Sequence, residues 1–212
     1  IDTGMDQEDA EDVVRIGDFV TMDRDFIELG DHLSCKAFDD RMGVYVMLEA
    51  LRRMQDHQFD IYAVATVQEE QGLRGATTGA YGIEPDLGVA LDVTIAADIP
   101  GSSEHSYVTK LGKGTAIKIM DSASISNYRL VDFLRDLAED KGIPYQMEIL
   151  PRGGTDAGAM ERSRQGCPVV TISIPTRYVH TVVESAHKGD VEASCDLLAR
   201  FLEVAHEGDF SL

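Results

Sequence analysis

The sequence predicts an α/β protein in which a mostly parallel mixed sheet is sandwiched between helices. Short apolar runs, typical of buried strands, alternate with longer stretches whose apolar side chains recur at helical spacing. This alternation favours a sheet that helices cover on both faces. With 212 residues and 43% hydrophobic content, the chain can bury the core of one large domain.

The first part of this alternation begins with a helix. Residues 42–54 carry apolar side chains at helical spacing, and Asp39 and Asp40 precede them, where carboxylates suit a helix start. Residues 61–67 form a continuous apolar run, which predicts a buried strand. Residues 73–81 predict a short helix.

The second part continues the same rhythm. Apolar runs predict four further strands, at residues 87–92, 115–120, 145–150 and 168–174. Helical spacing predicts three further helices, at residues 126–141, 155–162 and 187–207. Gly142 and Pro144 close the first of these helices, because glycine suits a helix end and proline cannot continue a helix.

The amino-terminal stretch has a different character. An acidic segment, residues 7–12, is helix-like, and residues 14–20 alternate like a strand with a glycine turn. The second pattern is typical of a small β-barrel or sandwich module. We therefore expect residues 1–33 to be the remnant of a small β domain and residues 34–212 to form the main domain.

The charge of the chain excludes two classes of partner. The formal net charge is -19, from 38 acidic and 19 basic residues. A phosphate backbone or an anionic membrane surface would be repelled, so we expect neither nucleic acid nor membrane as a partner. No run approaches the roughly 18 apolar residues of a membrane-spanning helix.

Cysteine usage indicates a reducing compartment. Cys35, Cys167 and Cys195 are widely spaced and form no CxxC pattern, which argues against a disulfide framework and against a cysteine zinc site. We expect a cytoplasmic protein.

Acidic residues and a histidine follow or end several of the apolar segments, and we expect them to share one site: Asp39, Asp40, Glu69, Glu70, Asp92 and His180. Ligands of such sheets gather at the carboxyl ends of the strands. Imidazole and carboxylate groups are ligands of zinc or cobalt in hydrolytic sites, and manganese also accepts them. Two metals require a bridging carboxylate, for which we expect Asp39. Glu69 is expected to be the general base that takes a proton from metal-activated water and passes it to the leaving amine.

Two further features concern the support of these ligands. Glu184 follows His180 and is expected to act as an acceptor behind it. The adjacent pair Asp39 and Asp40 suggests an unusual peptide geometry, which proteins retain where function requires it.

A glycine-rich turn and one arginine complete the candidate residues. Gly154, Thr155 and Asp156 lie in this turn, and we expect a substrate-facing loop there because Asp156 would repel the phosphates of a nucleotide. Arg177 either attracts acidic residues of a substrate or forms a structural ion pair.

Six motifs, in order, resemble those of family 42 of the metallopeptidases, which contains glutamyl, tetrahedral and deblocking aminopeptidases. The motifs are KAFDDR at 36–41, VQEEQGLRGA at 67–76, ALDV at 90–93, LGKG at 111–114, GGTD at 153–156 and PTRYVH at 175–180. The resemblance implies the fold of the zinc-dependent exopeptidases over residues 34–206, and it likens residues 1–33 to the end of the family's PDZ-like insert.

The resemblance also implies roles. Asp39 becomes the bridging ligand, Glu69 the base, Glu70 and Asp92 one-metal ligands, and His180 a ligand of the other metal. The implied activity is a dinuclear metal-dependent aminopeptidase that uses two zinc or cobalt ions to remove amino-terminal residues from short peptides. The family assembles into homo-oligomers, from dimers to dodecamers.

One departure from the family keeps alternatives open. The family supplies a further metal-binding histidine from an amino-terminal His-x-Asp segment, and this sequence contains no such segment. We therefore expect a partial chain that lacks this segment and most of the insert. The alternatives are a related dinuclear hydrolase, such as a deacylase or carboxypeptidase, and a catalytically impaired peptide-binding scaffold.

Overall fold

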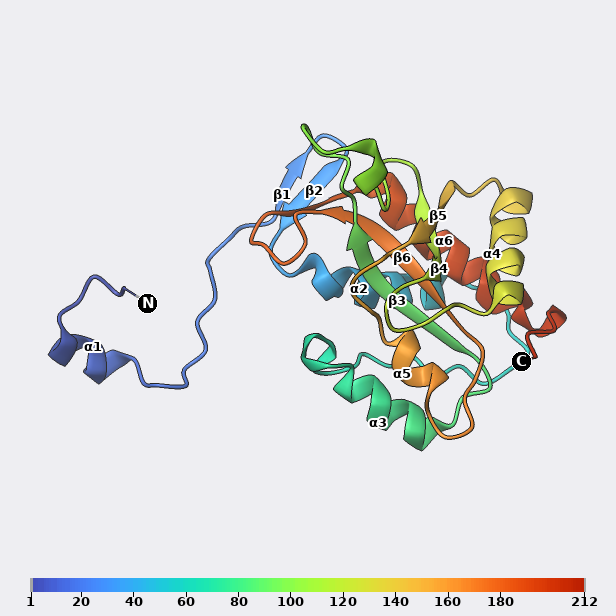
Figure 1. Cartoon of the computed structure of the whole chain (residues 1–212), viewed down its shortest axis with the longest axis horizontal. Helices are drawn as coiled ribbons and strands as arrows, with labels where there is room; N and C mark the ends of the chain where they lie inside the picture. Colours follow the sequence, from blue (N-terminus) through green and yellow to red (C-terminus); the bar gives the residue numbers. More distant parts are fainter. Residues whose placement is uncertain (1, 212) are drawn as a thin grey trace.

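One mixed sheet forms the centre of the structure (Figure 1), a computed structural model that describes residues 2–211. Its strands are β1 (Ile27–Leu29), β2 (His32–Cys35), β3 (Gly88–Ile95), β4 (Thr115–Met120), β5 (Tyr145–Ile149), β6 (Val169–Arg177) and β7 (Glu184–His187). The strand order is β1-β2-β7-β6-β4-β5, and β3 pairs with β6. The long central strand β6 therefore joins the parts of the sheet.

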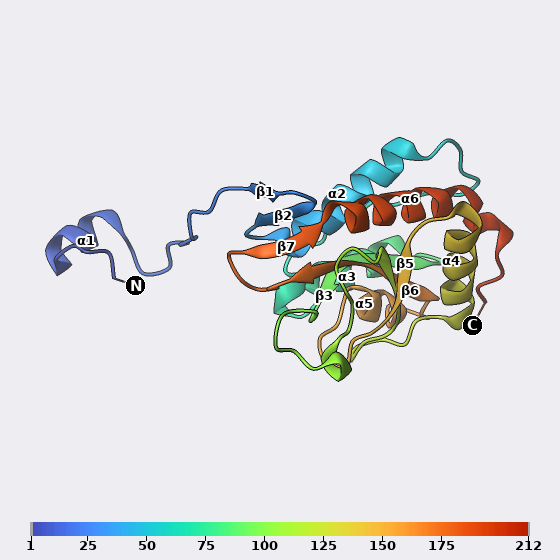
Figure 2. The ribbon, with the colours of Figure 1, turned by 90° about the horizontal axis from the view of Figure 1, so that it is seen from above.

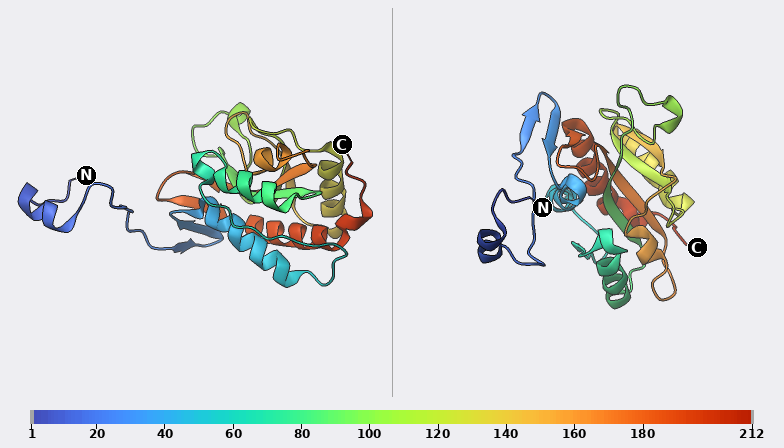
Figure 3. Two further views of the ribbon diagram at one scale, coloured as in Figure 1. Left: turned by 90° about the horizontal axis from the view of Figure 1, so that it is seen from below. Right: turned by 60° about the vertical axis from the view of Figure 1, so that its left-hand side comes forward.

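Helices cover both faces of this sheet (Figures 2 and 3). The covering helices are α2 (Phe38–Arg53), α3 (Arg74–Ile83), α4 (Tyr128–Lys141), α5 (Ala157–Glu161) and α6 (Lys188–Val204). The chain also forms α1 (Gln7–Val13) and the short 3-10 turns η1 (Glu69–Gln71), η2 (Glu104–Ser106) and η3 (Ala205–Glu207). The larger core packs α2, α4 and α6 against the sheet through residues such as Val46, Leu134, Ile172 and Leu197. The smaller core packs α5 on the opposite face through Ala90, Ala157 and Val169. None of the helices described combines the length and hydrophobicity that crossing a membrane requires.

The predicted α/β class with a mixed sheet between helices is confirmed. Parallel pairing joins β3 to β6 and β4 to β5. Antiparallel pairing joins β1 to β2, β2 to β7, β4 to β6 and β6 to β7, so parallel pairings are fewer than the sequence analysis expected. The five predicted main-domain helices are present with shifted ends, as is the acidic helix α1.

Two predicted strands are absent. Residues 14–20 form no strand, and α1 and the chain that leads to β1 lie outside the sheet and its helices (Figures 1 and 2). Residues 61–67 also pair with no strand, and Tyr62, Val64 and Val67 are exposed. An apolar run becomes a strand only where a neighbouring strand pairs with it, and no described strand pairs with either segment.

Other boundaries also differ from the prediction. Strand β3 continues to Ile95, so Asp92 lies within the strand and does not end it. Strand β6 continues to Arg177, which brings His180 closer to the strand end than expected. The hairpin β1-β2 joins the main sheet through β7, although the boundary between residues 33 and 34 remains a prediction. Ile1 and Leu212, the outer ends of the two expected domains, lie outside the described residues.

Candidate metal and catalytic site

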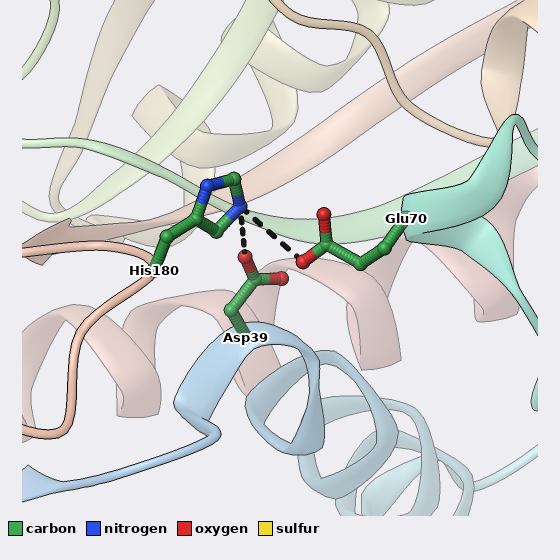
Figure 4. A group of neighbouring side chains, drawn as sticks. All are labelled: Asp39, Glu70 and His180. Atoms are coloured by element: carbon green, nitrogen blue, oxygen red, sulfur yellow. Dashed lines mark ion pairs between the residues drawn. The ribbon is translucent and has the colours of Figure 1, made fainter. Parts of the chain in front are cut away.

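Segments far apart in the sequence meet at one place beside the sheet. Asp39 lies at the start of α2, Glu70 in η1, and His180 in the loop between β6 and β7, and their side chains point toward one another (Figure 4). His180 Nε2 lies 3.0 Å from Asp39 Oδ2 and 3.3 Å from Glu70 Oε1. The His180 and Glu70 side chains are 67% and 55% exposed, so this group is open to solvent.

A second group of acids also includes Asp39. Three carboxylate oxygens, one each from Asp39, Asp40 and Asp92, lie within 4.8 Å of one another. In the first group, three ligand atoms, one each from Asp39, Glu70 and His180, also lie within 4.8 Å of one another. Asp39 belongs to both groups, as a bridging ligand must. One imidazole nitrogen among carboxylate oxygens is a donor set that zinc, cobalt and manganese accept. The residues present therefore fit divalent cations.

The start of α2 positions the two aspartates. The peptide bond between Asp39 and Asp40 is cis, in agreement with the expected unusual geometry. The Gly43 N–H donates to Asp40 Oδ1 at 3.0 Å, which fixes the second carboxylate over the first turn of the regular helix. Both residues have non-helical backbone angles, so the chain turns sharply where it carries these acids.

The Glu184 carboxylate lies directly behind two of the candidate ligands. Its Oε2 accepts hydrogen bonds from the backbone N–H groups of Phe38, at 2.6 Å, and Asp39, at 3.1 Å. Its Oε1 accepts from the backbone N–H of His180 at 2.8 Å. The sequence indicated an acceptor behind His180, and the contact with the start of α2 is an additional feature that the sequence did not indicate.

The turn that carries Glu69 and Glu70 is fastened on two sides. The Thr66 hydroxyl donates to Asp156 Oδ2 at 2.6 Å, which ties the segment before the turn to the start of α5. The Gly75 N–H donates to Val67 O at 2.9 Å. A Cβ on Gly75 would lie 2.5 Å from the Val67 nitrogen, so only glycine allows α3 to approach this segment so closely.

Burial, and then the crowding of acids, raises several pKa values in this site. Burial, followed by the charge of Glu70, raises the pKa of Asp39 to about 6. Burial is also the main reason that the pKa of Asp40 rises to about 8 and that of Asp92 rises well above its usual range. Burial, and then the charge of Asp156, raises the pKa of Glu69 to about 7.

These shifts have a shared electrostatic origin. Buried carboxylates close to one another resist ionisation because each charge loses hydration and repels its neighbours. A divalent cation between them would offset that repulsion and restore the ionised forms. The electrostatics of the site therefore agree with the donor set.

The remaining candidate residues have structural contacts. Thr155 is buried, with its hydroxyl 2.9 Å from that of Thr171, and Gly154 packs against Ala123. Arg177 forms two hydrogen bonds with the Asp98 carboxylate, at 2.8 and 2.9 Å. Of the two roles considered for Arg177, the structure shows the ion pair.

Sequence reasoning missed two residues that bind candidate residues. Asp98 holds Arg177, and Thr66 holds Asp156, yet each pair is separated by many residues in the chain. Neither Asp98 nor Thr66 stands in a motif with a recognisable spacing. A single sequence carries no signal for such pairs.

The relationship to known proteins follows from a match over most of the chain. Residues 1–197 match the family described as M42 glutamyl aminopeptidase. The chain belongs to this family. The resemblance seen in the six motifs is thereby confirmed.

Relatives of this M42 chain include aminopeptidases, one of them with a solved structure. The lysyl aminopeptidase of Pyrococcus furiosus is 38% identical over 208 residues, which cover 97% of this chain and 59% of the relative. The aminopeptidase APDkam598 from the archaeon Desulfurococcus kamchatkensis is 45% identical, with a TM-score of 0.90 over 93% of this chain and 56% of that one.

An assembling relative is also similar. The TET1 peptidase of Pyrococcus horikoshii, described as able to form a tetrahedron or a large octahedral shell, is 32% identical with a TM-score of 0.77. The match covers 92% of this chain and 58% of that one. The M42 chain thus spans less than two thirds of the length of these relatives.

Proposed function

We propose that this chain provides the catalytic site of a dinuclear metal-dependent aminopeptidase that removes amino-terminal residues from short peptides. The observation that carries the proposal is the position of Asp39 in both groups of candidate ligands. Membership of the M42 family and the names of the relatives support it.

We assign Glu70 and His180 to one ion, because their ligand atoms fall in the same group, Asp92 to the other, and Asp39 to both. This assignment moves Glu70 from the metal of Asp92, where the resemblance placed it, to the metal of His180. Divalent cations at such a site supply Lewis acidity and lower the pKa of water. Zinc, cobalt and manganese all suit the donor set. Within residues 2–211 the group around Asp92 contains carboxylates alone, so we expect the ion beside His180 to bind more tightly.

Glu69 is the proposed general base. Burial raises its pKa to about 7 in the metal-free chain, and a bound cation would lower that pKa, so Glu69 would be ionised and able to take up a proton at neutral pH. It accepts a proton from the attacking water and passes it to the departing amine. The acidic surroundings also attract the positively charged amino terminus of a peptide, which suits an aminopeptidase.

The experiment compares the chain with its Glu69→Gln variant on aminoacyl p-nitroanilides and N-acetyl amino acids, with zinc or cobalt and with a chelator. We expect the chain to release p-nitroaniline from the aminoacyl substrates, to leave the N-acetyl amino acids intact, and to lose this activity when the chelator is added. Glu69→Gln should lower kcat by about 10²- to 10⁴-fold while metal binding persists. Glu8→Gln, in the exposed first turn of α1, is the control and should change neither kcat nor metal binding.

Other outcomes refute specific parts of the proposal. Hydrolysis of N-acetyl substrates would favour a deacylase, and bound metal without turnover would favour a peptide-binding scaffold. Activity that survives the chelator would exclude a metal mechanism.

Two properties of the whole protein belong to the same proposal. We expect a homo-oligomer because the similar TET1 peptidase assembles into closed shells, and light scattering of the purified chain tests this. We place the protein in the cytoplasm because all three cysteines are free thiols, as a reducing compartment favours.

A further inference from the structure

The buried carboxylate of Glu184 contacts both ligand-bearing segments of the site. Glu184 is 2% exposed, and its two oxygens accept the three backbone hydrogen bonds from Phe38, Asp39 and His180 described above. One side chain on β7 therefore joins the start of α2 to the loop after β6. Asp39 and His180 are the residues whose side chains lie 3.0 Å apart in the candidate metal site.

We propose that Glu184 is a positioning residue that holds Asp39 and His180 in the geometry for metal binding. It contributes no ligand atom to either group. Its effect passes through the backbone, because each ligand side chain is attached to a residue whose N–H group Glu184 holds. This inference rests on the proposed metal site. It adds a residue that holds the two ligands Asp39 and His180 at their observed distance from each other.

The two acceptor oxygens of Glu184 are essential to this role. A carboxylate has acceptor oxygens only, so each of its two ends can accept a backbone N–H. Glutamine has nearly the same shape but replaces one oxygen with an NH₂ donor. In the Glu184→Gln variant, the NH₂ group must point either at the backbone N–H of His180 or at that of Asp39. Two donors then face each other, and the segment on that side loses its hydrogen bond to residue 184.

Another buried carboxylate provides a matched control. Asp190, at the start of α6, is 1% exposed and accepts backbone hydrogen bonds from Gly112 and Gly114, both at 2.7 Å. Its partners lie in a loop that carries no candidate ligand. Asp190→Asn removes the same kind of interaction and should leave metal binding unchanged even where it lowers thermal stability.

The experiment measures zinc affinity by titration calorimetry for the chain and for Glu184→Gln, Glu184→Asp and Asp190→Asn. Loss of a group that orients a ligand typically lowers metal affinity about 10- to 100-fold, which we expect for Glu184→Gln. Glu184→Asp keeps the charge with a shorter reach and should lie between Glu184→Gln and the parent. Equal zinc affinity of Glu184→Gln and the parent, or an equal loss in Asp190→Asn, would overturn the proposal.

Hydrogen exchange separates this proposal from that of the enzymatic function. In the parent chain without metal, the amides of Phe38, Asp39 and His180 should exchange slowly because Glu184 holds them. Glu184→Gln should speed the exchange of at least one of the two segments. If the parent binds no zinc, the proposed function fails, and rapid exchange of these amides in the parent would independently refute the role of Glu184.

Discussion

The metal-free chain should lose stability as the pH rises from 5 to 8, and Asp40 illustrates the size of the effect. Burial is the main cause that raises the pKa of this carboxyl from 3.8 to about 8. In the unfolded chain an aspartate ionises near its ordinary pKa, whereas the folded chain keeps Asp40 protonated up to about pH 8. The folded state therefore binds more protons in this window, and its stability falls as the pH increases.

The magnitude follows from the shift. One pKa unit corresponds to about 1.4 kcal/mol. With a folded pKa of about 8, Asp40 lowers the free energy of unfolding by ~4 kcal/mol between pH 5 and pH 8. For a domain of about 150–250 residues, each kcal/mol changes the Tm by roughly 2–4 °C. We expect Asp40 alone to make the Tm of the metal-free chain ~8–16 °C lower at pH 8 than at pH 5.

Circular dichroism melts in the presence of a chelator test this expectation. Asp40→Asn removes one of the titrating groups, so its Tm should fall less between pH 5 and pH 8 than that of the parent. The remaining fall comes from Asp39, Glu69 and Asp92. Zinc or cobalt should restore the Tm of the parent chain at pH 8, because a cation offsets the charge that Asp40 would bury. A metal-free Tm that is constant or rises from pH 5 to pH 8 would refute the electrostatic reasoning.

Two further substitutions test packing around the site. Lys118 is 1% exposed, with Nζ 3.2 Å from Glu148 Oε1 and 3.6 Å from Asp121 Oδ2, so Lys118→Met leaves buried carboxylates without a cation. We expect a loss of about 3–5 kcal/mol in urea unfolding, partly recovered in the Lys118→Met/Glu148→Met double variant, and a loss below about 1 kcal/mol would contradict a buried ion pair. Gly75→Ala forces α3 away from the Val67 backbone and displaces the Glu69 turn, so kcat should fall at least about tenfold and the Tm should fall as well. Unchanged turnover in Gly75→Ala would show that the close approach is not needed.

The sequence predicted the residues of the candidate site better than it predicted the sheet. Asp39, Glu70 and His180 stand where apolar segments end or turn, and this local signal is visible without a structure. Strands β3, β4, β5 and β6 were also visible as apolar runs. Local composition is enough for such features because they depend on nearby residues.

Features that depend on distant partners were missed. Residues 61–67 have the composition of a strand, but pairing requires a neighbour that composition cannot supply. Strand β7 is short and begins and ends with the polar residues Glu184 and His187, so it resembles a loop in the sequence. The backbone contacts of Glu184 could not be predicted because only the folded chain brings β7 to α2.

The Glu184 contacts also constrain the order of folding. Its bonds to Phe38 and Asp39 join residues that are 146 and 145 positions apart. Such contacts close a long loop and form only after the intervening chain has organised. A fragment that lacks either end of this loop cannot assemble the pair of Asp39 and His180. Acquisition of high-affinity zinc binding during refolding would therefore report completion of the native topology, later than the formation of helices.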